Sequence, residues 1–344
     1  MTVRVLLVDD SSFVRDIMRH GLSRFPDIEI VGEASDGRRA EQAVIDLRPD
    51  VVTMDVVMPM VSGLDAIRNI MRRQPTPIIV VSEAYSNREQ LTMDAMHAGA
   101  IDVFPKPLSG FDDEAAEKLA TLLRIAARTR VRPRRAETEP VAPFEPATSA
   151  AQRIATHCRF AGIVSSTGGP QTLHRMFKHI EATQAPPMAI VQHISPGFDK
   201  SFATWLNKDT DLCVCLAEDG MHVPAGTVAI APNDVHLEIR PGGYVRLHQG
   251  ETVKSHRPSG TLLLRSIAES FGSTGVGVIL TGMGDDGAEG ASELEARGGT
   301  ILVEDPTTAV IDGMPKAAIE HTRSAIVDRA PKLARLLRKR RVGR

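Results

Sequence analysis

Three kinds of side chain that support nucleophilic catalysis follow three apolar segments in the second half of the chain. Ser166 ends "AGIVSS", His193 follows "AIVQ", and Asp285 and Asp286 follow "GVILTGMG". Because the carboxyl ends of parallel strands meet at one edge of a sheet, we expect the hydroxyl, imidazole and carboxylate to converge there. A nucleophile, a base and an acid that orients the base make up an acyl-transfer triad. The sequence therefore predicts a hydrolytic site.

Each of these residues also has a simpler interpretation. Ser166 could cap the helix that follows it. His256, in "KSHRPSG", competes with His193 as the base. Spacing alone does not separate Asp285 from Asp286. The convergence of all three chemical types at strand ends nevertheless favours the triad.

The turn after Ser166 reads "SSTGGP" and suits the same chemistry. Gly168 and Gly169 would let backbone N–H groups approach a reacting carbonyl, and Pro170 fits the first turn of a helix. The free amides at a helix start can stabilise a developing oxyanion. We therefore expect an oxyanion site beside Ser166.

A second glycine motif suggests a different function. Residues 282–287, "GMGDDG", fit the G-x-G-x-x-G pattern of a dinucleotide site, and Glu304 lies about 20 residues further on. Two aspartates would repel a pyrophosphate, however. The motif also falls near the end of its domain, whereas the fingerprint normally opens the series of strands and helices. Both points disfavour nucleotide binding.

The first half of the chain carries acids at its strand ends. Asp9 and Asp10 follow one apolar segment, Asp55 follows another, and Ser82 and Lys106 end two more. A single acid in such a place can be a helix cap, but three carboxylates in one crevice repel each other unless a cation lies among them. An oxygen-only set suits Mg²⁺. Lys106 would then neutralise an added anion, Ser82 would hydrogen-bond it, and Asp55 would be the nucleophile that forms an acyl phosphate.

Alternating apolar segments and amphipathic helical patterns position these residues. They predict an α/β fold with two doubly wound parallel-sheet domains. Residues 226–249 alternate in polarity about a Pro-Gly-Gly turn, which predicts an added antiparallel hairpin beside the second sheet. Proline and mixed charges between the two series indicate a linker. We expect domains at residues 1–125 and 154–330, a linker at 126–153 and a basic tail at 331–344.

Composition limits the function further. The net charge of −2 gives no general attraction to nucleic acid, and the basic tail suits a solvated helix end. No apolar run approaches the roughly 20 residues of a membrane span, and the first residues lack a signal-peptide core. Cys158, Cys213 and Cys215 lack Cys-x-x-Cys spacing and suit small buried residues in a reducing compartment. We therefore expect a cytoplasmic protein with no nucleic-acid partner and no membrane insertion.

The first domain resembles the response-regulator receiver family. The segments "VLLVDDS", "DVVTMDVVMPMVSGLDAI" and "FPKP" carry the resemblance and occur in the family's order. The resemblance implies a flavodoxin-like fold and phosphorylation of Asp55 by a chemosensory histidine kinase, with Mg²⁺ held by Asp9, Asp10 and Asp55. It also implies a relay to the surface through Ser82, Phe104 and Lys106.

The second domain resembles the catalytic domain of the chemotaxis methylesterase family (CheB, protein-glutamate methylesterase). The resemblance is carried by "SSTGGP", "VQHISPGFDKSFATWL", "DGMHVPAGTVAIAPNDVHLEI", "HRPSG", "VILTGMGDDGAEG" and "EDPTTAVIDGMP". It implies a Rossmann-like domain in which Ser166 is the nucleophile, His193 the base and Asp286 the orienting carboxylate. It further implies a supporting hydroxyl on Thr167 and an oxyanion donor in the Met283 amide.

The resemblance implies a phosphorylation-activated hydrolase that demethylates glutamate methyl esters on chemoreceptors, and it extends to deamidation of receptor glutamines. The esterase reaction needs no cofactor, and the unphosphorylated receiver is expected to cover the catalytic rim. A phosphorylation-switched receptor-binding scaffold without catalysis is the alternative, which the intact triad disfavours.

The chain departs from the usual family pattern in three places. Val164 and Ser165 replace Gly-Ala, Gly260 and Thr261 replace Val-Asp, and Asp312 stands where an aromatic residue is frequent. These departures leave the triad untouched. The bulkier Val164 is expected to tighten the turn, and the changes near residues 260 and 312 bear on substrate preference.

Overall fold

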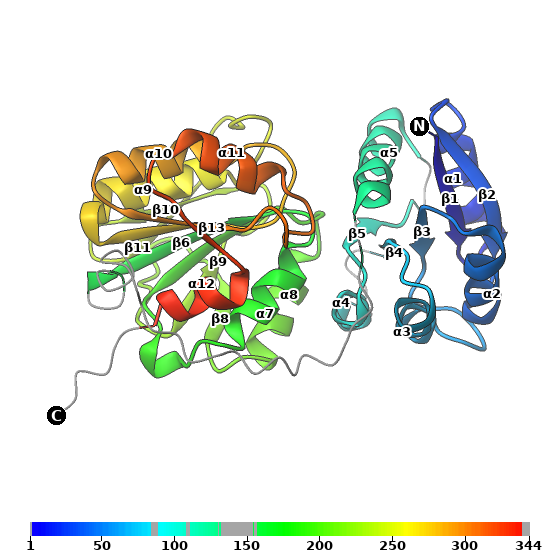
Figure 1. Cartoon of the computed structure of the whole chain (residues 1–344), viewed down its shortest axis with the longest axis horizontal. Helices are drawn as coiled ribbons and strands as arrows, with labels where there is room; N and C mark the ends of the chain where they lie inside the picture. The colour runs from blue at the N-terminus through cyan, green and yellow to red at the C-terminus, as the bar shows by residue number, and fades with distance from the viewer. Residues whose placement is uncertain are drawn as a thin grey trace. The chain divides into compact units, whose positions relative to one another are not determined.

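The structure is a computed structural model that describes residues 2–83, 89–107, 111–129, 131, 154 and 157–338. The chain divides into two compact units, residues 1–139 and 140–344, each of which is described by itself (Figure 1). Residues 130 and 132–153, most of the expected linker, lie outside the described residues.

The first unit is a five-stranded parallel sheet between two layers of helices, with α1 and α5 on one face and α2, α3 and α4 on the other (Figure 1). The strand order is β2-β1-β3-β4-β5, as in flavodoxin-like folds. Its elements are β1 (Val3–Val8), α1 (Ser12–Leu22), β2 (Ile28–Ala34), α2 (Gly37–Leu47), β3 (Val51–Met54), α3 (Gly63–Arg73), β4 (Ile78–Ser82), α4 (Glu89–Ala98), β5 (Asp102–Pro105) and α5 (Asp113–Arg128).

The second unit contains a seven-stranded parallel sheet in the order β14-β13-β12-β6-β7-β9-β8. Helices α9, α10 and α11 cover one face and α7, α8 and α12 the other (Figure 1). Its α-helices and strands are β6 (Phe160–Ser165), α7 (Gly169–Phe177), β7 (Met188–Gln192), α8 (Asp199–Lys208), β8 (Cys213–Leu216), β9 (Thr227–Ile230), β10 (His236–Arg240), β11 (Tyr244–His248), α9 (Gly260–Phe271), β12 (Gly275–Ile279), α10 (Ala288–Ala296), β13 (Thr300–Glu304), α11 (Gly313–His321), β14 (Ile326–Asp328) and α12 (Ala330–Leu336). Two 3₁₀ turns, Ala182–Gln184 and Gly272–Thr274, complete the series.

The strand orders explain where the functional residues lie. In the first unit the connections diverge between β1 and β3, and in the second they diverge between β6 and β12. In an open parallel sheet, such a switch point leaves a crevice at the carboxyl ends of the two strands. Asp9 and Asp55 follow β1 and β3, whereas Ser166 and the 281–286 loop follow β6 and β12.

Three expectations need correction. The hairpin is shorter than expected: β10 and β11 pair antiparallel, but β9 runs parallel between β7 and β8 in the main sheet. Cys213 is exposed on edge strand β8 rather than buried. Helix α5 extends to Arg128, beyond the expected boundary at residue 125.

The expected tail also begins too early. Helix α12 starts at Ala330 and packs against α7, and Leu333, Leu336 and Leu337 are buried. The first part of the 331–344 stretch therefore belongs to the second unit, because these side chains complete its core. Residues 339–344 lie outside the described residues.

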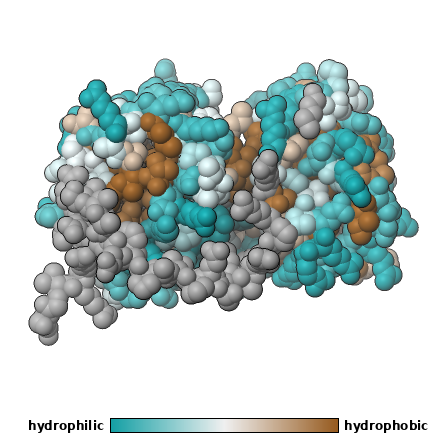
Figure 2. All heavy atoms as spheres, viewed as in Figure 1, coloured by the Kyte–Doolittle hydropathy of each residue, from teal (hydrophilic) through white to brown (hydrophobic). Residues whose placement is uncertain are grey.

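Hydrophilic residues predominate on the face of each unit seen in Figure 2, with smaller hydrophobic areas between them. The apolar strands are instead buried, as in β6 and β7, where every residue is buried. Within the described parts of the chain, no helix has the length and apolar character needed to span a bilayer.

Candidate functional site

Ser166 lies directly after the buried strand β6. Its backbone N–H donates to the Thr281 carbonyl at 3.0 Å, so the loop after β12 holds the start of the turn. Gly168 has φ +79°, and a Cβ at that position would lie 2.5 Å from Cβ of Val310. Only glycine fits both requirements. Gly168 is also the N-cap of α7, which has no side-chain cap, so the Ser166 hydroxyl does not cap this helix.

His193 and Asp286 form a hydrogen-bonded pair. The distance between His193 Nε2 and Asp286 Oδ2 is 3.0 Å. The Asp286 carboxylate also accepts the Ser259 hydroxyl at 2.9 Å and the Gly260 and Thr261 amides at 2.6 and 3.0 Å. The last two amides begin α9, so a residue from another loop caps this helix and faces the positive end of its dipole.

These contacts set the charge of Asp286. Burial alone would raise its pKa, but the hydrogen bond and charge of His193 and the Gly260 and Thr261 amides hold the pKa well below its usual value. The carboxylate is therefore an anion throughout the neutral range. It can fix the ring orientation of His193 and stabilise a positive charge on that ring.

The structure does not join Ser166 to His193 by a hydrogen bond, among the residues it describes. His193 Nδ1 is buried and has no hydrogen-bond partner in the described parts of the chain. Nucleophile–base hydrogen bonds are often absent from ligand-free sites and form in the substrate complex. Nδ1 is thus the ring nitrogen that remains able to accept a proton, since Nε2 faces Asp286.

His256 lies against His193 rather than replacing it. The two rings are stacked, with centroids 4.1 Å apart and planes within 4°. Burial and the neighbouring His193 lower the pKa of His256, which favours its neutral form. In the described structure, His256 makes no hydrogen bond to Asp285 or Asp286. The carboxylate of Asp286 bonds His193 instead and therefore orients the His193 ring.

Asp285 and Asp286 occupy different environments. Asp285 is half exposed and pairs with Lys254 at 2.6 Å, whereas Asp286 is 1% exposed and faces His193. Glu304, the acid of the possible nucleotide motif, is also 1% exposed and accepts the Thr281 amide at 2.9 Å. A ribose cannot reach a carboxylate buried in this way. The geometry therefore disfavours the dinucleotide interpretation.

Three backbone amides in the described loops that follow β6 and β12 have no protein partner. Among the described residues, the N–H groups of Thr167, Gly168 and Met283 make no hydrogen bond to protein. The loop after β12 passes close to the serine, because a Cβ on Gly282 would lie 2.8 Å from Ser166 Cβ. The Thr167 carbonyl accepts the Thr281 hydroxyl at 2.9 Å, which fixes the two loops to each other. These amides are available to an oxyanion.

Two of the departures from the family pattern are packing partners. A Cβ on Gly260 would lie 2.1 Å from Val164 Cγ1. The larger Val164 is therefore accommodated because residue 260 lacks a side chain. Asp312 precedes α11 and pairs with Lys316 at 2.7 Å, on the surface.

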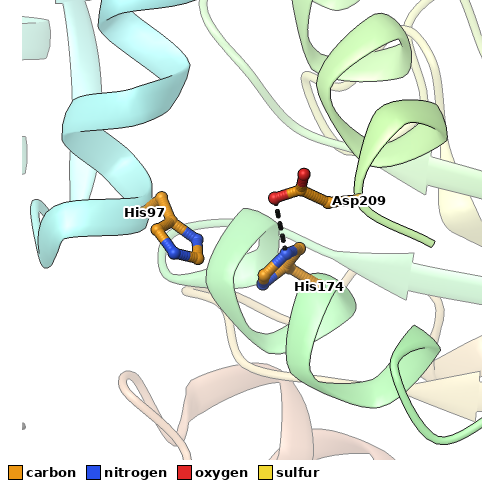
Figure 3. A group of neighbouring side chains, drawn as sticks. All are labelled: His97, His174 and Asp209. Carbon is orange, nitrogen blue, oxygen red and sulfur yellow. Dashed lines mark hydrogen bonds and ion pairs between the residues drawn. The ribbon is translucent and has the colours of Figure 1, made fainter.

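A second histidine–aspartate pair lies between helices rather than at strand ends. His174 of α7 bonds through Nε2 to Asp209 Oδ2 at 3.2 Å, after α8 (Figure 3). The His174 ring stacks on Trp205 of α8 with centroids 4.7 Å apart. Because His174 is buried and Asp209 is exposed, we interpret this pair as a contact at the edge of the α7–α8 interface that packs α7 against α8.

The receiver-like unit brings its acids together. Asp9, Asp10 and Asp55 can each place one carboxylate oxygen within 4.8 Å of the others. Lys106 Nζ lies 2.9 Å from Asp9 and 2.8 Å from Asp55. Asp10, Asp55 and Lys106 border an open pocket of about 630 Å³. Ser11, not an aspartate, caps α1, which leaves the acids available to a ligand.

The charges in this pocket are not balanced. Burial raises the pKa of Asp9, the Lys106 hydrogen bond lowers it, and Asp55 raises it again, with a net upward shift. Asp9 Oδ2 is buried, and the Lys106 ammonium group at 2.9 Å is the cation that pairs with it. Three close carboxylate oxygens with one lysine are a donor set that suits Mg²⁺. The residues present therefore fit such an ion.

The expected relay residues lie next to this pocket. Ser82 is buried and accepts the Thr92 hydroxyl at 2.9 Å, so its own proton can be donated elsewhere. The Lys106 amide donates to the Ser82 carbonyl at 2.8 Å, joining the ends of β4 and β5. Phe104 is buried with its ring edge-on to Phe111.

The residues that hold Asp286 were not identified from the sequence. The only sequence signal at Ser259 was its residue type and its position at the N-cap of a helix. In the structure its hydroxyl donates to Asp286 and makes no cap bond. Gln192, which bonds to both Ser166 and His193, also gave no signal. Local spacing does not reveal partners 26 residues apart.

Comparison with known proteins places this geometry in a family. Residues 161–337 match the model described as CheB methylesterase, and residues 5–115 match that of the response regulator receiver domain. The chain is 39% identical over 324 residues to protein-glutamate methylesterase/protein-glutamine glutaminase 3 of Anaeromyxobacter dehalogenans (strain 2CP-C), covering 92% of each chain. It is 38% identical to number 4 of the same name from Myxococcus xanthus (strain DK1622), covering 98% of this chain and 97% of that one.

A solved structure agrees with the second unit. The crystal structure of the Thermotoga maritima CheB methylesterase catalytic domain is similar with a TM-score of 0.50 and 39% identity, over 52% of this chain and 97% of that chain. Fold and comparisons together define a response-regulator receiver domain joined to an α/β effector domain. The chain belongs to the CheB methylesterase family.

Proposed function

We propose that this chain is a phosphorylation-activated hydrolase that removes methyl groups from glutamate methyl esters on chemoreceptors. Curated relatives named protein-glutamate methylesterase/protein-glutamine glutaminase support the substrate class. The observation that carries the proposal is the 3.0 Å hydrogen bond between the buried Asp286 carboxylate and His193 Nε2, and His193 and Ser166 follow the paired strands β7 and β6.

The first half of the reaction uses the free ring nitrogen of His193. The N–H group at Nε2 donates a hydrogen bond to Asp286, so Nδ1 is the unprotonated ring nitrogen and accepts the proton of Ser166. The Ser166 side chain turns toward Nδ1 as substrate binds, and Oγ attacks the ester carbonyl. The negative oxygen that forms is stabilised by the amides of Met283 and of the Thr167–Gly168 turn. Methanol leaves with the proton returned by His193.

The second half regenerates the enzyme. Water gives a proton to His193 Nδ1 and attacks the acyl-serine carbonyl. His193 then returns that proton to Ser166 Oγ as the acyl–oxygen bond breaks, which releases the glutamate side chain and restores Ser166. Asp286 stays ionised throughout and keeps His193 in the required tautomer. A glutamine amide would follow the same steps with ammonia as the leaving group, consistent with the second half of the relatives' name.

Phosphorylation would occur in the receiver pocket. Asp9, Asp10 and Asp55 would hold Mg²⁺, which supplies charge neutralisation for transfer to Asp55 from a chemosensory histidine kinase. Lys106 and Ser82 would contact the added phosphoryl group, which brings about −1.5 to −2 charge. In the unphosphorylated chain the receiver would restrict access of the bulky receptor to the catalytic unit.

Methanol release from methylated receptor membranes tests the proposal. Wild type should release methanol faster with acetyl phosphate and Mg²⁺, and Ser166→Ala should lose at least about 10⁴-fold in kcat. Fluorescence of Trp205, the single tryptophan and buried in the second unit, reports whether the variant is folded. Receptor binding without methanol release by wild type would instead support the scaffold alternative, and normal release by a folded Ser166→Ala variant would exclude the serine mechanism.

A further inference from the structure

Gln192 joins the ends of the two strands that carry Ser166 and His193. This buried side chain donates through Nε2 to the Ser166 carbonyl and to the His193 carbonyl, both at 2.8 Å. Its Oε1 accepts the hydroxyl of Ser165 at 2.6 Å. Ser165 and Gln192 are direct partners in the β6–β7 register, and the His193 amide donates to the Ser165 carbonyl at 2.9 Å.

Only one orientation of the Gln192 amide satisfies this arrangement. Backbone carbonyls accept hydrogen bonds and cannot donate, so the NH₂ group must face Ser166 and His193. The remaining oxygen then requires a donor, which the Ser165 hydroxyl supplies. Ser165 is completely buried, and without this partner its hydroxyl would be costly in the core.

The start of α7 encloses the amide on its remaining side. A Cβ on Gly169 would lie 2.0 Å from Gln192 Oε1 and 2.9 Å from Ser165 Cβ. The Gly169 amide also donates to the Ser166 carbonyl at 2.8 Å. The amide of Gln192 therefore has little room to rotate, and the two backbones that it bonds are held at a fixed separation.

We propose that Ser165 and Gln192 form a positioning pair that sets the distance between Ser166 and His193. The inference rests on the proposed function, because it assigns the pair a role in that same reaction. No hydrogen bond joins the Ser166 and His193 side chains in the described structure, so their approach during attack depends on the backbone frame. Neither member of the pair needs to touch substrate. Displacement of about 1 Å at a reacting centre can cost about 10²-fold in rate.

The test compares Ser165→Ala, Gln192→Leu and the double variant in the full chain. We expect kcat for methanol release to fall about 3–10-fold in Ser165→Ala and on the order of 10²-fold in Gln192→Leu, with KM within about two-fold of wild type. The rate at which a fluorophosphonate labels Ser166 should fall in parallel. Because Ser165 acts through Gln192, adding Ser165→Ala to Gln192→Leu should change kcat no further.

Ser201→Ala is the matched control. Its hydroxyl is buried and bonds the carbonyl of Phe198, the N-cap of α8, at 2.9 Å, so the variant loses a comparable bond without affecting the strand ends. It should lower thermal stability slightly and leave kcat unchanged. If Gln192→Leu does not fold, Ser165→Ala still decides the matter by its effect on kcat.

The outcomes separate the two proposals. Unchanged kcat and labelling in a folded Ser165→Ala or Gln192→Leu variant, with Ser166→Ala inactive, would overturn the positioning pair and leave the hydrolase intact. Additive effects in the double variant would show that Ser165 does not act through Gln192. Normal methanol release by Ser166→Ala would overturn the proposed function itself.

Discussion

The two units place acids at the same topological position and treat them in opposite ways. In each sheet the acids lie at the carboxyl end of strands beside a switch point. In the receiver unit, three carboxylates lie together beside an open pocket, and one lysine pairs with two of them. In the second unit, one carboxylate receives four hydrogen bonds from His193, Ser259, Gly260 and Thr261.

This difference appears in the protonation behaviour of the acids. The pKa of Asp9 is raised, chiefly by burial and by Asp55 beyond what Lys106 offsets. The pKa of Asp286 is lowered although it is buried, because His193 and the start of α9 stabilise the anion. An uncompensated acid cluster suits a site that must receive a cation and a phosphoryl group. A compensated acid suits a fixed part that orients another catalytic residue.

The largest test of this comparison is Asp286→Asn. An amide cannot hold the His193 tautomer or balance its positive charge, so kcat for methanol release should fall about 10⁴-fold. The variant should also be less stable at neutral pH. The lowered pKa of Asp286 stabilises the folded wild type at pH values above 3.8, its value in the unfolded chain, and this stabilisation is lost as the pH falls through the folded pKa.

Asp285→Asn is the matched control for Asp286→Asn. Asp285 is half exposed and pairs with Lys254 at the surface, so kcat should change less than about three-fold. Equal losses in the two variants would contradict the assignment of Asp286. Trp205 fluorescence separates loss of activity from loss of folding.

The sequence predicted the strand ends correctly because apolar segments followed by polar residues are a local signal. Asp55, Ser166, His193 and Asp286 all lie where a parallel sheet would place them. The environment of these residues was not predictable in the same way. Whether an acid is compensated depends on amides such as those of Gly260, which come from distant loops and reach the site only after packing.

Glu304 extends the comparison to an uncompensated acid inside the catalytic unit. Burial raises its pKa to about 7, against a partial offset from the Thr281 amide and Arg175. The pKa of Glu304 is higher in the folded chain than its value of 4.5 in the unfolded chain. The contribution of Glu304 to stability is therefore greatest below about pH 4.5 and declines as the pH rises to about 7. The free energy of unfolding should fall by about 3 kcal/mol in total because of Glu304 ionisation.

Glu304→Gln should remove this pH dependence and stabilise the catalytic unit at pH 8, since the amide oxygen can still accept the Thr281 N–H. Urea unfolding followed by Trp205 fluorescence at pH 5 and pH 8 measures the effect. Glu293→Gln is the control, because Glu293 is paired with Arg265 and its pKa is lowered. A Glu304→Gln variant less stable than wild type at pH 8 would show that the carboxylate is compensated after all.

Packing around the compensated acid can be tested through Gly260. Gly260→Ala would press its Cβ against Val164 and displace the amide that bonds Asp286. Overpacking of this kind costs about 1–3 kcal/mol. Val164→Ala should relieve it, so the double variant should be more stable than the sum of the single effects by at least about 1 kcal/mol. Additive losses, measured by urea unfolding, would show that the two residues are independent.

Asp9→Asn should have the smallest effect on stability, and it should stabilise its unit whereas Asp286→Asn destabilises its own. In the absence of Mg²⁺, removing one of three clustered negative charges should stabilise the receiver unit on the order of 1 kcal/mol. The raised pKa of Asp9 gives the same sign, because ionisation of this group opposes folding once the pH exceeds its unfolded value of 3.8. Mg²⁺ at millimolar concentration should reverse the order, since wild type retains all three ligands and binding stabilises only the folded state.

Calorimetry of the full chain with EDTA and with Mg²⁺ measures this reversal. Asp10→Asn is the informative control: Asp10 is exposed, so its removal should weaken the Mg²⁺ effect without much stabilising the metal-free receiver. If Asp9→Asn destabilises the receiver even in EDTA, Lys106 already balances the negative charge of the three carboxylates. The acids of the receiver would then be compensated as Asp286 is, and the contrast between the two units would be wrong. If only the Mg²⁺ response is lost, the uncompensated charge at Asp9 serves the cation and contributes nothing to the fold.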